Sequence, residues 1–492
     1  MSEKQLSRRS FLRNAGIAGL ATLLAGCAPK IVEVTKIVEK EKVVEKEKVV
    51  KETVVVEKQV EKKVEVTKVV EKEVTKIVEK AAPGQAVLPK MKLRFGYGGW
   101  AKDYSDIMIA NFQSVEPNVE VELEVIAGDL IQVLYTQAAA GTTGDVQWIA
   151  DAHVMNLGDA GVMLDMTPLA EADPDDITKD IYPVMLGLGK WQNKWYMIPW
   201  AADAPVMYYN KTMLEKAGYP LPDPLKGYTV QEFQEACGKV SNEKDQVYGY
   251  NGVDSIPWWA IYVPWVVGFG GQFYNEDKSK CMMDTPEAME GCQALADITC
   301  KYKGAVPKGA NFGGDPFILG KACFYLMNRF HCKNIRTALV KFEWDVAVPP
   351  RQPKKHTAGA GTMGPGVSAA SQKRGTAQAA WKLASIIAKP ATQKHFARQY
   401  LSIPVLMSMA KDPSWYDLPA PPANRDVFLE IPKIAITPPN PKDPSCGTVY
   451  VGETNKIMND AWDQMLVGCK PAKEVLPGAV KLINECIARG GK

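Results

Sequence analysis

The 492-residue sequence contains few of the groups that most enzymes use at an active site. Its four histidines are scattered, at His153, His331, His356 and His395. They form no HExxH motif, and no C-x-x-C zinc site is present. The G-x-S-x-G motif of many serine hydrolases is also missing. The sequence therefore predicts no catalytic residues, no metal site and no bound cofactor.

Charge and apolar runs exclude two further classes. The formal net charge is only +3, from 59 basic and 56 acidic residues. A nucleic-acid partner would need a concentrated basic face, so we expect none. The apolar run from Ala15 to Ala25 is shorter than the roughly 20 residues that span a bilayer. The chain is long enough for two or three domains with large cores, and its 46% hydrophobic content fits a globular protein.

The N-terminus reads as an export signal. Ser7-Arg8-Arg9-Ser10-Phe11-Leu12 matches the twin-arginine pattern, and Leu24-Ala25-Gly26-Cys27 ends the apolar run like a lipobox. We predict a signal peptide over residues 1–27, after which Cys27 is lipidated and anchors the chain to the membrane. A plain signal peptide with a chance cysteine is the alternative. Either reading places the protein outside the cytoplasm, at the cell surface or in a periplasm.

Residues 28–90 are predicted to be a low-complexity stalk and linker. Pairs of Val or Ile recur every six residues from position 31 to position 56, between runs of Lys and Glu. A six-residue period places no single apolar stripe on a helix, so an ordinary coiled coil is not favoured. Valine also favours strands. The conformation of the stalk stays open, as does its self-association.

The folded part begins with alternating strands and amphipathic helices. Strands are predicted at 91–95, 119–126 and 145–149, with helices at 104–115 and 129–141 between them. This is a βαβαβ pattern, which is typical of a parallel sheet covered by helices. Further along, Thr229 and Glu232 form a capping box that predicts a helix start. Other helices are expected from 284, over 377–388 and over 475–486.

The stretch Trp195–Lys211, WYMIPWAADAPVMYYNK, predicts a hinge. Two short apolar runs flank a small bend that contains Asp203. Pro199 and Pro205 lack a backbone donor, which suits strands at an edge or at a crossing. We expect a strand, a bend, a second strand and then a helix, with Asp203 where the chain passes from one compact unit to another.

An ordered series of segments resembles the family 1 extracellular solute-binding proteins, the group that includes maltose-binding proteins. The segments lie at 193–199, 209–218, 268–271, 311–325 and 359–371, and the resemblance covers roughly residues 91–490. It implies an α/β fold of two discontinuous lobes joined by a hinge, the type II periplasmic-binding-protein-like fold. Lobe I is expected at 91–204 plus 345–398, and lobe II at 205–344 plus 399–492.

The same resemblance implies capture of a small solute between the lobes and delivery to the membrane-spanning subunits of an ABC permease. A carbohydrate is the expected solute, because aspartates accept hydrogen bonds from hydroxyl groups and aromatic rings stack on sugar faces. Peptides, polyamines, phosphate esters and metals stay open as alternative solutes. Core packing is the alternative for each tryptophan, and a helix cap or solvated position for each aspartate. Met363 stands where relatives often carry an aromatic residue. The predicted ligand-binding residues are Tyr97, Trp100, Asp103, Asp151, Asp203, Trp258, Trp259, Trp265, Arg329, Gly361 and Met363.

Two other functions remain open at this stage. Gly96-x-Gly98-x-x-Ala101 follows a strand and precedes a helix, as in a dinucleotide-binding loop, and Glu122 or Glu124 lies where a ribose-binding acid is expected. This would suit an exported NAD-dependent oxidoreductase, although the bulky Trp100 is unusual in such a loop. The other alternative is an envelope interaction protein in which the stalk is the functional part.

Nine cysteines follow Cys27, so at least one is a free thiol or forms an intermolecular link. Residues Cys281, Cys292 and Cys300, together with the pair Cys323 and Cys332, are close enough in sequence to be bridge candidates. An extracytoplasmic location permits disulfides. The sequence does not assign partners, and free buried thiols are the alternative.

Overall fold

A computed structural model describes residues 36–41, 69–74, 88–128, 130–202, 204–399, 402–412 and 418–490. The predicted signal peptide with Cys27, most of the stalk, and Asp203 lie outside these residues. The chain divides into two units, Met1–Val78 and Glu79–Lys492. Within the described residues, no helix combines the length and apolarity needed to cross a membrane.

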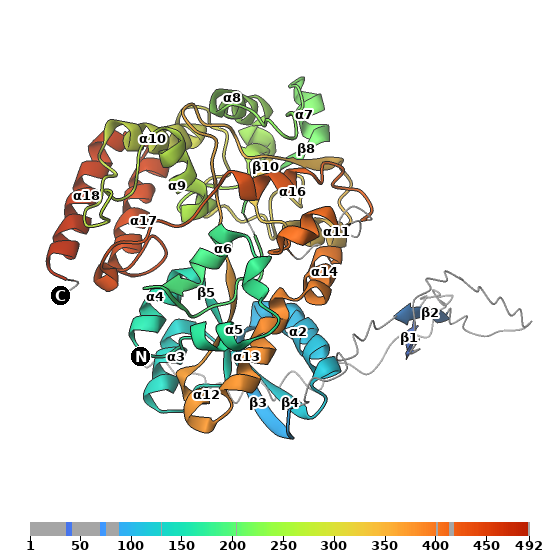
Figure 1. Cartoon of the computed structure of the whole chain (residues 1–492). Helices are drawn as coiled ribbons and strands as arrows, with labels where there is room; N and C mark the ends of the chain where they lie inside the picture. Colours follow the sequence, from blue (N-terminus) through green and yellow to red (C-terminus); the bar gives the residue numbers. More distant parts are fainter. Residues whose placement is uncertain are drawn as a thin grey trace, which may run out of the picture. The chain divides into compact units, whose positions relative to one another are not determined.

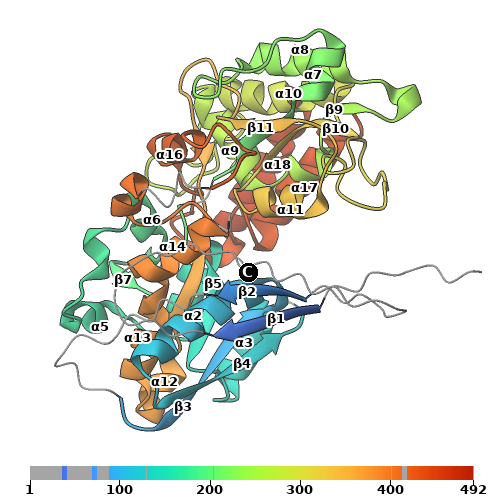
Figure 2. The same cartoon turned by 90° about the vertical axis from the view of Figure 1, so that its right-hand side faces the viewer.

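The described residues of the first unit form two strands. These are β1 (Lys36–Glu41) and β2 (Val69–Val74), which pair in parallel (Figure 2). Their register sets Lys36 opposite Val69 and Glu41 opposite Val74. The sequence left the conformation of the stalk open, and these two segments adopt the extended form that valine favours.

The second unit starts with a four-stranded sheet in the order β13-β5-β3-β4. β3 (Met91–Gly98), β4 (Val119–Ile126) and β5 (Val146–Ala150) are parallel, as the βαβαβ pattern predicts, and β13 (Met363–Val367) joins antiparallel to β5. Its helices are α2 (Lys102–Val115), α3 (Leu130–Ala139), α4 (Asp151–Asp159), α5 (Thr167–Ala172), α6 (Pro183–Leu188), α12 (Ala369–Arg374), α13 (Ala377–Ser385) and α14 (Pro390–Arg398). Short elements in this part are η1 (Gly99–Ala101), η2 (Ile177–Lys179), β6 (Lys190–Trp191), β7 (Lys194–Trp195) and η5 (Ile386–Ala388).

A second four-stranded sheet has the order β11-β8-β10-β9. Its strands are β8 (Val206–Asn210), β9 (Tyr248–Tyr250), β10 (Ala322–Met327) and β11 (Trp344–Ala347). The predicted lobe boundary at 344/345 falls inside β11, which pairs with β8 in this sheet. Its helices are α7 (Lys211–Ala217), α8 (Val230–Val240), α9 (Trp259–Gly268), α10 (Pro286–Cys300), α11 (His331–Ala338), α17 (Gly452–Leu466) and α18 (Ala472–Ala488), with η3 (Glu243–Asp245) and η4 (Val253–Ser255) between them.

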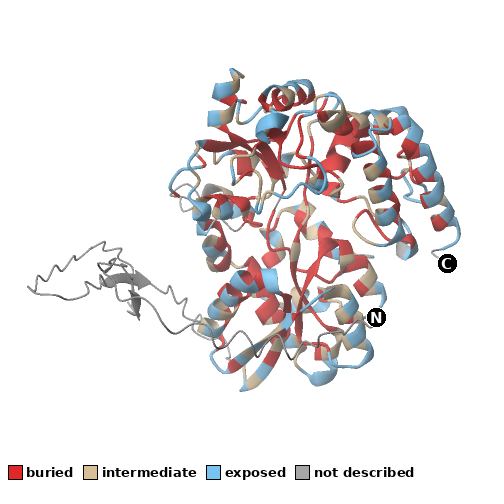
Figure 3. Cartoon of the chain, turned by 180° about the vertical axis from the view of Figure 1, so that it is seen from behind, coloured by how far each residue is buried: buried red, intermediate tan, exposed pale blue. Residues whose placement is uncertain are grey.

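Each sheet lies at the centre of its own lobe, with helices around it (Figure 1). Buried residues follow the strands, whereas the outer faces of the helices are exposed (Figure 3). The capping box that opens α8 is present: the Thr229 hydroxyl accepts from the backbone N–H of Glu232 at 3.2 Å, and the Glu232 carboxylate accepts from the N–H of Thr229 at 2.7 Å. A cap of this kind stabilises a helix by about 1 kcal/mol.

Three segments connect the lobes, at 196–205, 348–362 and 399–451. In the first, the N–H groups of Ile198 and Trp200 donate to Pro365 and Met363 of β13, and Pro199 between them needs no partner. Gln393 is fully buried and joins the first segment to the third, since its amide donates to the Trp200 carbonyl and accepts from the N–H of Val405. The third segment carries η6 (Met407–Lys411), α16 (Val427–Glu430), η7 (Ile431–Lys433), β14 (Ala435–Ile436) and η8 (Pro444–Cys446), and β14 pairs with β12 (Ala358–Gly359) of the second.

Two disulfides cross-link the second lobe. They join Cys300 to Cys469 and Cys446 to Cys486. Of the predicted bridge candidates only Cys300 is bridged, and its partner lies 169 residues away, a separation that spacing does not reveal. The other candidates are buried free thiols, so local pairing of Cys323 with Cys332 was wrong. Among the described residues, the free cysteines are all buried: Cys237, Cys281, Cys292, Cys323 and Cys332.

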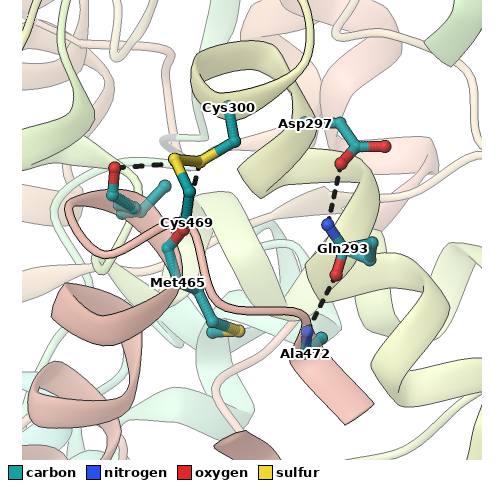
Figure 4. Close-up of a disulfide and its surroundings, with 7 residues drawn as sticks. Gln293, Asp297, Cys300, Met465, Cys469 and Ala472 are labelled. Carbon is teal, nitrogen blue, oxygen red and sulfur yellow. Dashed lines mark hydrogen bonds between the residues drawn. A yellow bond between two sulfur atoms is a disulfide. The ribbon is translucent and has the colours of Figure 1, made fainter. Parts of the chain in front are cut away.

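The Cys300–Cys469 bridge lies where α10 ends and α18 begins. Beside it, the Gln293 side chain accepts from the N–H of Ala472 at 2.8 Å and donates to Asp297 at 2.7 Å (Figure 4). This amide therefore caps the start of α18 while the sulfur bridge holds the preceding turn. The two interactions together fix α18 against α10.

Removing this bridge is expected to destabilise the second lobe. The double variant Cys300→Ser, Cys469→Ser should lower the free energy of unfolding by about 2–4 kcal/mol, because the closed loop restricts the unfolded chain. Urea unfolding followed by tryptophan fluorescence measures the change. An unfolding curve identical to that of the wild type would contradict the expectation.

Candidate functional site

A cavity of about 1020 Å³ lies between the lobes. The first lobe contributes residues from α4, α6 and β6, and the second contributes residues from α9 and from segment 272–278. Segment 435–442 of the third connection completes the wall. This segment belongs to a proline-rich run that carries no recognisable pattern in the sequence. The volume is at the upper end of the range typical of small-molecule sites.

Asp151 lines this cavity at the start of α4, directly after β5. The side chain is only 5% exposed, and its carboxylate accepts from the backbone N–H of Ala152 at 2.7 Å and of Thr362 at 2.9 Å. Burial raises the pKa of Asp151 to about 7, against the opposing effect of these two hydrogen bonds. A buried carboxylate with remaining acceptor capacity is suited to binding hydroxyl groups.

Gly361 and Thr362 bring the second connection against Asp151. A Cβ at Gly361 would lie 3.2 Å from the Asp151 Oδ2 atom and 3.2 Å from the ring of Trp259, so this close approach favours glycine. The Thr362 hydroxyl donates to the Ala201 carbonyl at 3.0 Å, which joins the first and second connections. Asp151 is thus held by the same segment that links the lobes.

Three aromatic residues complete this cluster: Trp258 and Trp259 of the second lobe, and Tyr450 of the third connection. Trp258 and Trp259 lie at the start of α9, and the Trp259 ring packs against Tyr450 with ring centroids 5.9 Å apart. The Tyr450 hydroxyl lies 3.5 Å from the Trp258 indole nitrogen and 3.8 Å from the Cβ position at Gly361. Burial, aided by the charge of Asp151, raises the pKa of Tyr450 to about 12. We call Asp151, Trp258, Trp259, Gly361 and Tyr450 the Asp151 cluster.

Other predicted residues lie in the hydrophobic cores. Tyr97 is 3% exposed in the core of the first lobe, and Trp265 is 1% exposed in that of the second. Arg329 is 2% exposed and donates to the carbonyl groups of Ser402 and Ala397. For Trp265, core packing was the stated alternative. Met363 lies in β13, where it is half-buried against the first core.

Two predicted residues lie at the surface of the first lobe. Trp100 is 52% exposed and packs edge-on against Trp148, with ring centroids 5.9 Å apart. Asp103, at the start of α2, forms an ion pair of 2.6 Å with Lys333 of α11. Among the predicted ligand-binding residues that the structure describes, only Asp151 lines the cavity. Asp203 lies outside the described residues, so its role in binding stays a prediction.

The glycine-rich end of β3 is closed by side chains of the chain itself. A Cβ at Gly98 would lie 2.5 Å from the indole nitrogen of Trp100, and a Cβ at Gly96 would lie 2.1 Å from the side-chain oxygen of Gln147. Glu124 is paired with Arg94. The space through which a dinucleotide phosphate would approach Gly98 is therefore filled by the Trp100 ring.

Sequence reasoning missed Thr362 and Tyr450. Thr362 acts through its backbone N–H, which any residue other than proline supplies. Tyr450 lies near the end of the third connection, and no motif marks it. The flanking Gly447 and Gly452, both at φ +79°, are the only local sign of an unusual backbone there.

The architecture of this chain, two lobes with a cavity between them, is that of the two-lobed solute-binding proteins. A family model described as bacterial extracellular solute-binding protein matches residues 108–423, and the chain belongs to this family. Membership in a family of binding proteins argues against the oxidoreductase alternative, in agreement with the filled turn at Gly98.

Individual relatives are distant in sequence. A binding protein of Brucella abortus is 24% identical over 306 residues, covering 61% of this chain and 72% of the relative. The ABC substrate-binding protein of Listeria monocytogenes in complex with cycloalternan has a TM-score of 0.70 at 22% identity, covering 81% of this chain and 99% of that one. UgpB of Mycobacterium tuberculosis in complex with glycerophosphocholine has a TM-score of 0.67 at 19% identity, with coverages of 81% and 99%. These structures confirm the two-lobed α/β fold.

Proposed function

We propose that the protein captures a carbohydrate in the cavity between its lobes and delivers it to the permease of an ABC importer. The observation that carries this proposal is the cavity itself, which is lined by the buried carboxylate of Asp151 and by the half-buried ring of Trp191. Carboxylates accept sugar hydroxyls, and aromatic rings cover the apolar faces of sugars. The Listeria monocytogenes structure, solved with cycloalternan, supports the same solute class.

The size of the cavity favours a solute of more than one sugar ring. About 1020 Å³ exceeds what a single ring fills, since well-formed sites bury most of a ligand's surface. Delivery then requires closure of the lobes around the solute. The free energy for closure comes from the higher affinity of the solute for the closed form than for the open form. The twin-arginine signal and lipidation of Cys27 belong to this proposal and would hold the protein at the outer face of the membrane.

A thermal-shift panel on the full chain tests the solute class. Maltotriose, maltotetraose, cycloalternan, glucose and glycerophosphocholine form the panel, with NAD as a control. A ligand at 100-fold over its Kd stabilises by about 2.7 kcal/mol, which is readily measured. A shift with an oligosaccharide and none with glucose is expected. A shift with glycerophosphocholine alone would overturn the carbohydrate proposal, and one with NAD alone would restore the oxidoreductase alternative.

Solute affinity is expected to depend on pH through Asp151. Hydroxyl donors favour the charged carboxylate, so a bound solute lowers the pKa of Asp151 from about 7, and affinity rises as the pH increases through that value. If binding requires the charged form, the Kd at about pH 5 should be up to about 100-fold higher than at about pH 8. Isothermal titration calorimetry with the oligosaccharide of the panel measures this dependence.

The matched control is Asp151→Asn, which removes the titrating group but keeps one side-chain oxygen. Its affinity should be lower than that of the wild type at about pH 8 and nearly independent of pH. Parallel pH profiles for the wild type and this variant would contradict the role of Asp151.

A further inference from the structure

The six residues Cys446–Val451 form a tight loop, which we call the Tyr450 loop. The backbone N–H of Thr448 donates to the Val451 carbonyl at 2.8 Å, and the N–H of Tyr450 donates to the Thr448 hydroxyl at 3.1 Å. The two ends of the loop nearly touch: a Cβ at Gly447 would lie 2.1 Å from the Val451 carbonyl oxygen. Because Gly447 also has a φ of +79°, only glycine fits there without strain.

One covalent bond ties this loop to the body of the second lobe. Cys446 is bonded to Cys486 in the last turns of α18, and these residues are 2% and 0% exposed. On its other side the loop runs directly into α17, which packs against α18 (Figure 1). The loop is thus fixed at both ends to one pair of helices.

The loop presents Tyr450 to the Asp151 cluster. The Tyr450 ring packs on Trp259, and its hydroxyl meets the Trp258 indole nitrogen and approaches Gly361. Tyr450 is therefore the one member of the cluster that comes from the C-terminal part of the chain. Any change in the path of the loop shifts the ring that supports both tryptophans.

We propose that the Cys446–Cys486 bridge is a positioning element of the solute site, which holds Tyr450 against Trp258 and Trp259 and so fixes the cluster around Asp151. This inference rests on the proposed function and extends it: solute affinity depends on a covalent bond that does not touch the cavity. A preorganised site loses less conformational entropy on binding than a mobile one.

The second disulfide supplies a matched control. Cys300–Cys469 also staples α18 to the second lobe, but it lies at the other end of that helix, close to Ala472. The variants Cys446→Ser, Cys486→Ser and Cys300→Ser, Cys469→Ser are compared in the full chain. Both are expected to lower the thermal midpoint, so stability alone does not distinguish them.

Two readouts separate positioning from stability. Hydrogen–deuterium exchange of the free protein should show faster exchange over 447–451 only in the Cys446→Ser, Cys486→Ser variant. Calorimetry with maltotriose and maltotetraose should show a Kd raised at least about tenfold in that variant, and within about twofold of the wild type in the other. The variant Tyr450→Ala should reproduce the loss of affinity with both bridges intact, and Tyr450→Phe, which keeps the ring, should restore most of it.

The outcomes are distinct for the two proposals. Equal affinities in both bridge variants, or unchanged exchange over 447–451, would overturn the positioning role while the carbohydrate proposal stands. If the wild type binds none of the oligosaccharides of the thermal-shift panel, the carbohydrate proposal fails and the affinity claim fails with it. The exchange experiment still decides whether the bridge holds the loop.

Discussion

Replacing Asp151 with alanine is expected to weaken solute binding by about 100-fold or more. Hydrogen bonds to a charged group contribute roughly 1.5–3 kcal/mol each when one partner is removed, and a sugar normally presents more than one hydroxyl to a carboxylate. The substitution also leaves the N–H groups of Ala152 and Thr362 without their present acceptor. Thr362 belongs to the second connection between the lobes, so the segment around Gly361 loses its anchor as well.

The suitable control is Asp277→Ala. Asp277 lines the same cavity but is exposed, and it is held by the hydroxyl and N–H of Ser279. Its replacement should change the Kd by less than about threefold, because an exposed hydrogen bond contributes little net free energy. Calorimetry with the oligosaccharide that stabilises the wild type compares the two variants. A larger effect at Asp277 than at Asp151 would relocate the site toward segment 272–278.

The second large effect is on stability. The variant Arg329→Ala is expected to lower the free energy of unfolding by about 3–5 kcal/mol. The Arg329 guanidinium donates to the Ser402 carbonyl at 2.6 Å and the Ala397 carbonyl at 2.9 Å, and it lies over the Phe428 ring at 5.4 Å. Alanine removes these charge-assisted bonds and leaves a cavity behind them. Chemical denaturation followed by circular dichroism measures the loss.

Arg336, which follows Arg329 in the sequence and lies in α11, provides a comparison for the Arg329→Ala variant. Its guanidinium also donates to two backbone carbonyls, those of Pro419 and Pro421, but the side chain is partly exposed. Water replaces those bonds when Arg336 is changed to alanine, so we expect a loss of about 1 kcal/mol or less. Similar losses at the two positions would show that burial does not set the contribution of Arg329.

Features encoded in consecutive residues were predictable from the sequence. The alternating residues of 119–126 coincide with β4, and the Thr229–Glu232 capping box opens α8 as expected. The strand-bend-strand-helix reading of Trp195–Lys211 was correct for β8 and α7. Its first apolar run is extended and donates to β13 through the N–H groups of Ile198 and Trp200, but it forms no regular strand. Such features depend on interactions between residues that are close in the sequence, so they can be predicted from a single sequence.

Features that depend on distant contacts were not predictable. The sequence pointed to Asp151 by its place after a strand, yet its neighbours Thr362 and Tyr450 lie 211 and 299 positions later in the chain. Arg329 was expected at the ligand site together with the residues of the return segment, whereas its guanidinium donates to the backbone carbonyls of Ser402 and of Ala397 in α14. The residues next to Arg329 in the sequence do not indicate that those carbonyl groups lie beside its side chain. The same limit applies to both disulfides.

The five buried thiols are unevenly placed along the chain. Segments 91–204 and 345–398 contain no cysteine, and the free thiols among the described residues all belong to the segment 205–344 between them. Burial raises the pKa of Cys237, Cys281, Cys292, Cys323 and Cys332, which keeps them protonated and unreactive in the folded state. A thiol reagent therefore modifies these five thiols only as fast as the packing around each of them opens. Cys237, Cys281, Cys292 and Cys323 belong to the core of the second lobe and report on its opening, whereas Cys332 is packed in the core that contains the strands of the first lobe and also responds to changes there.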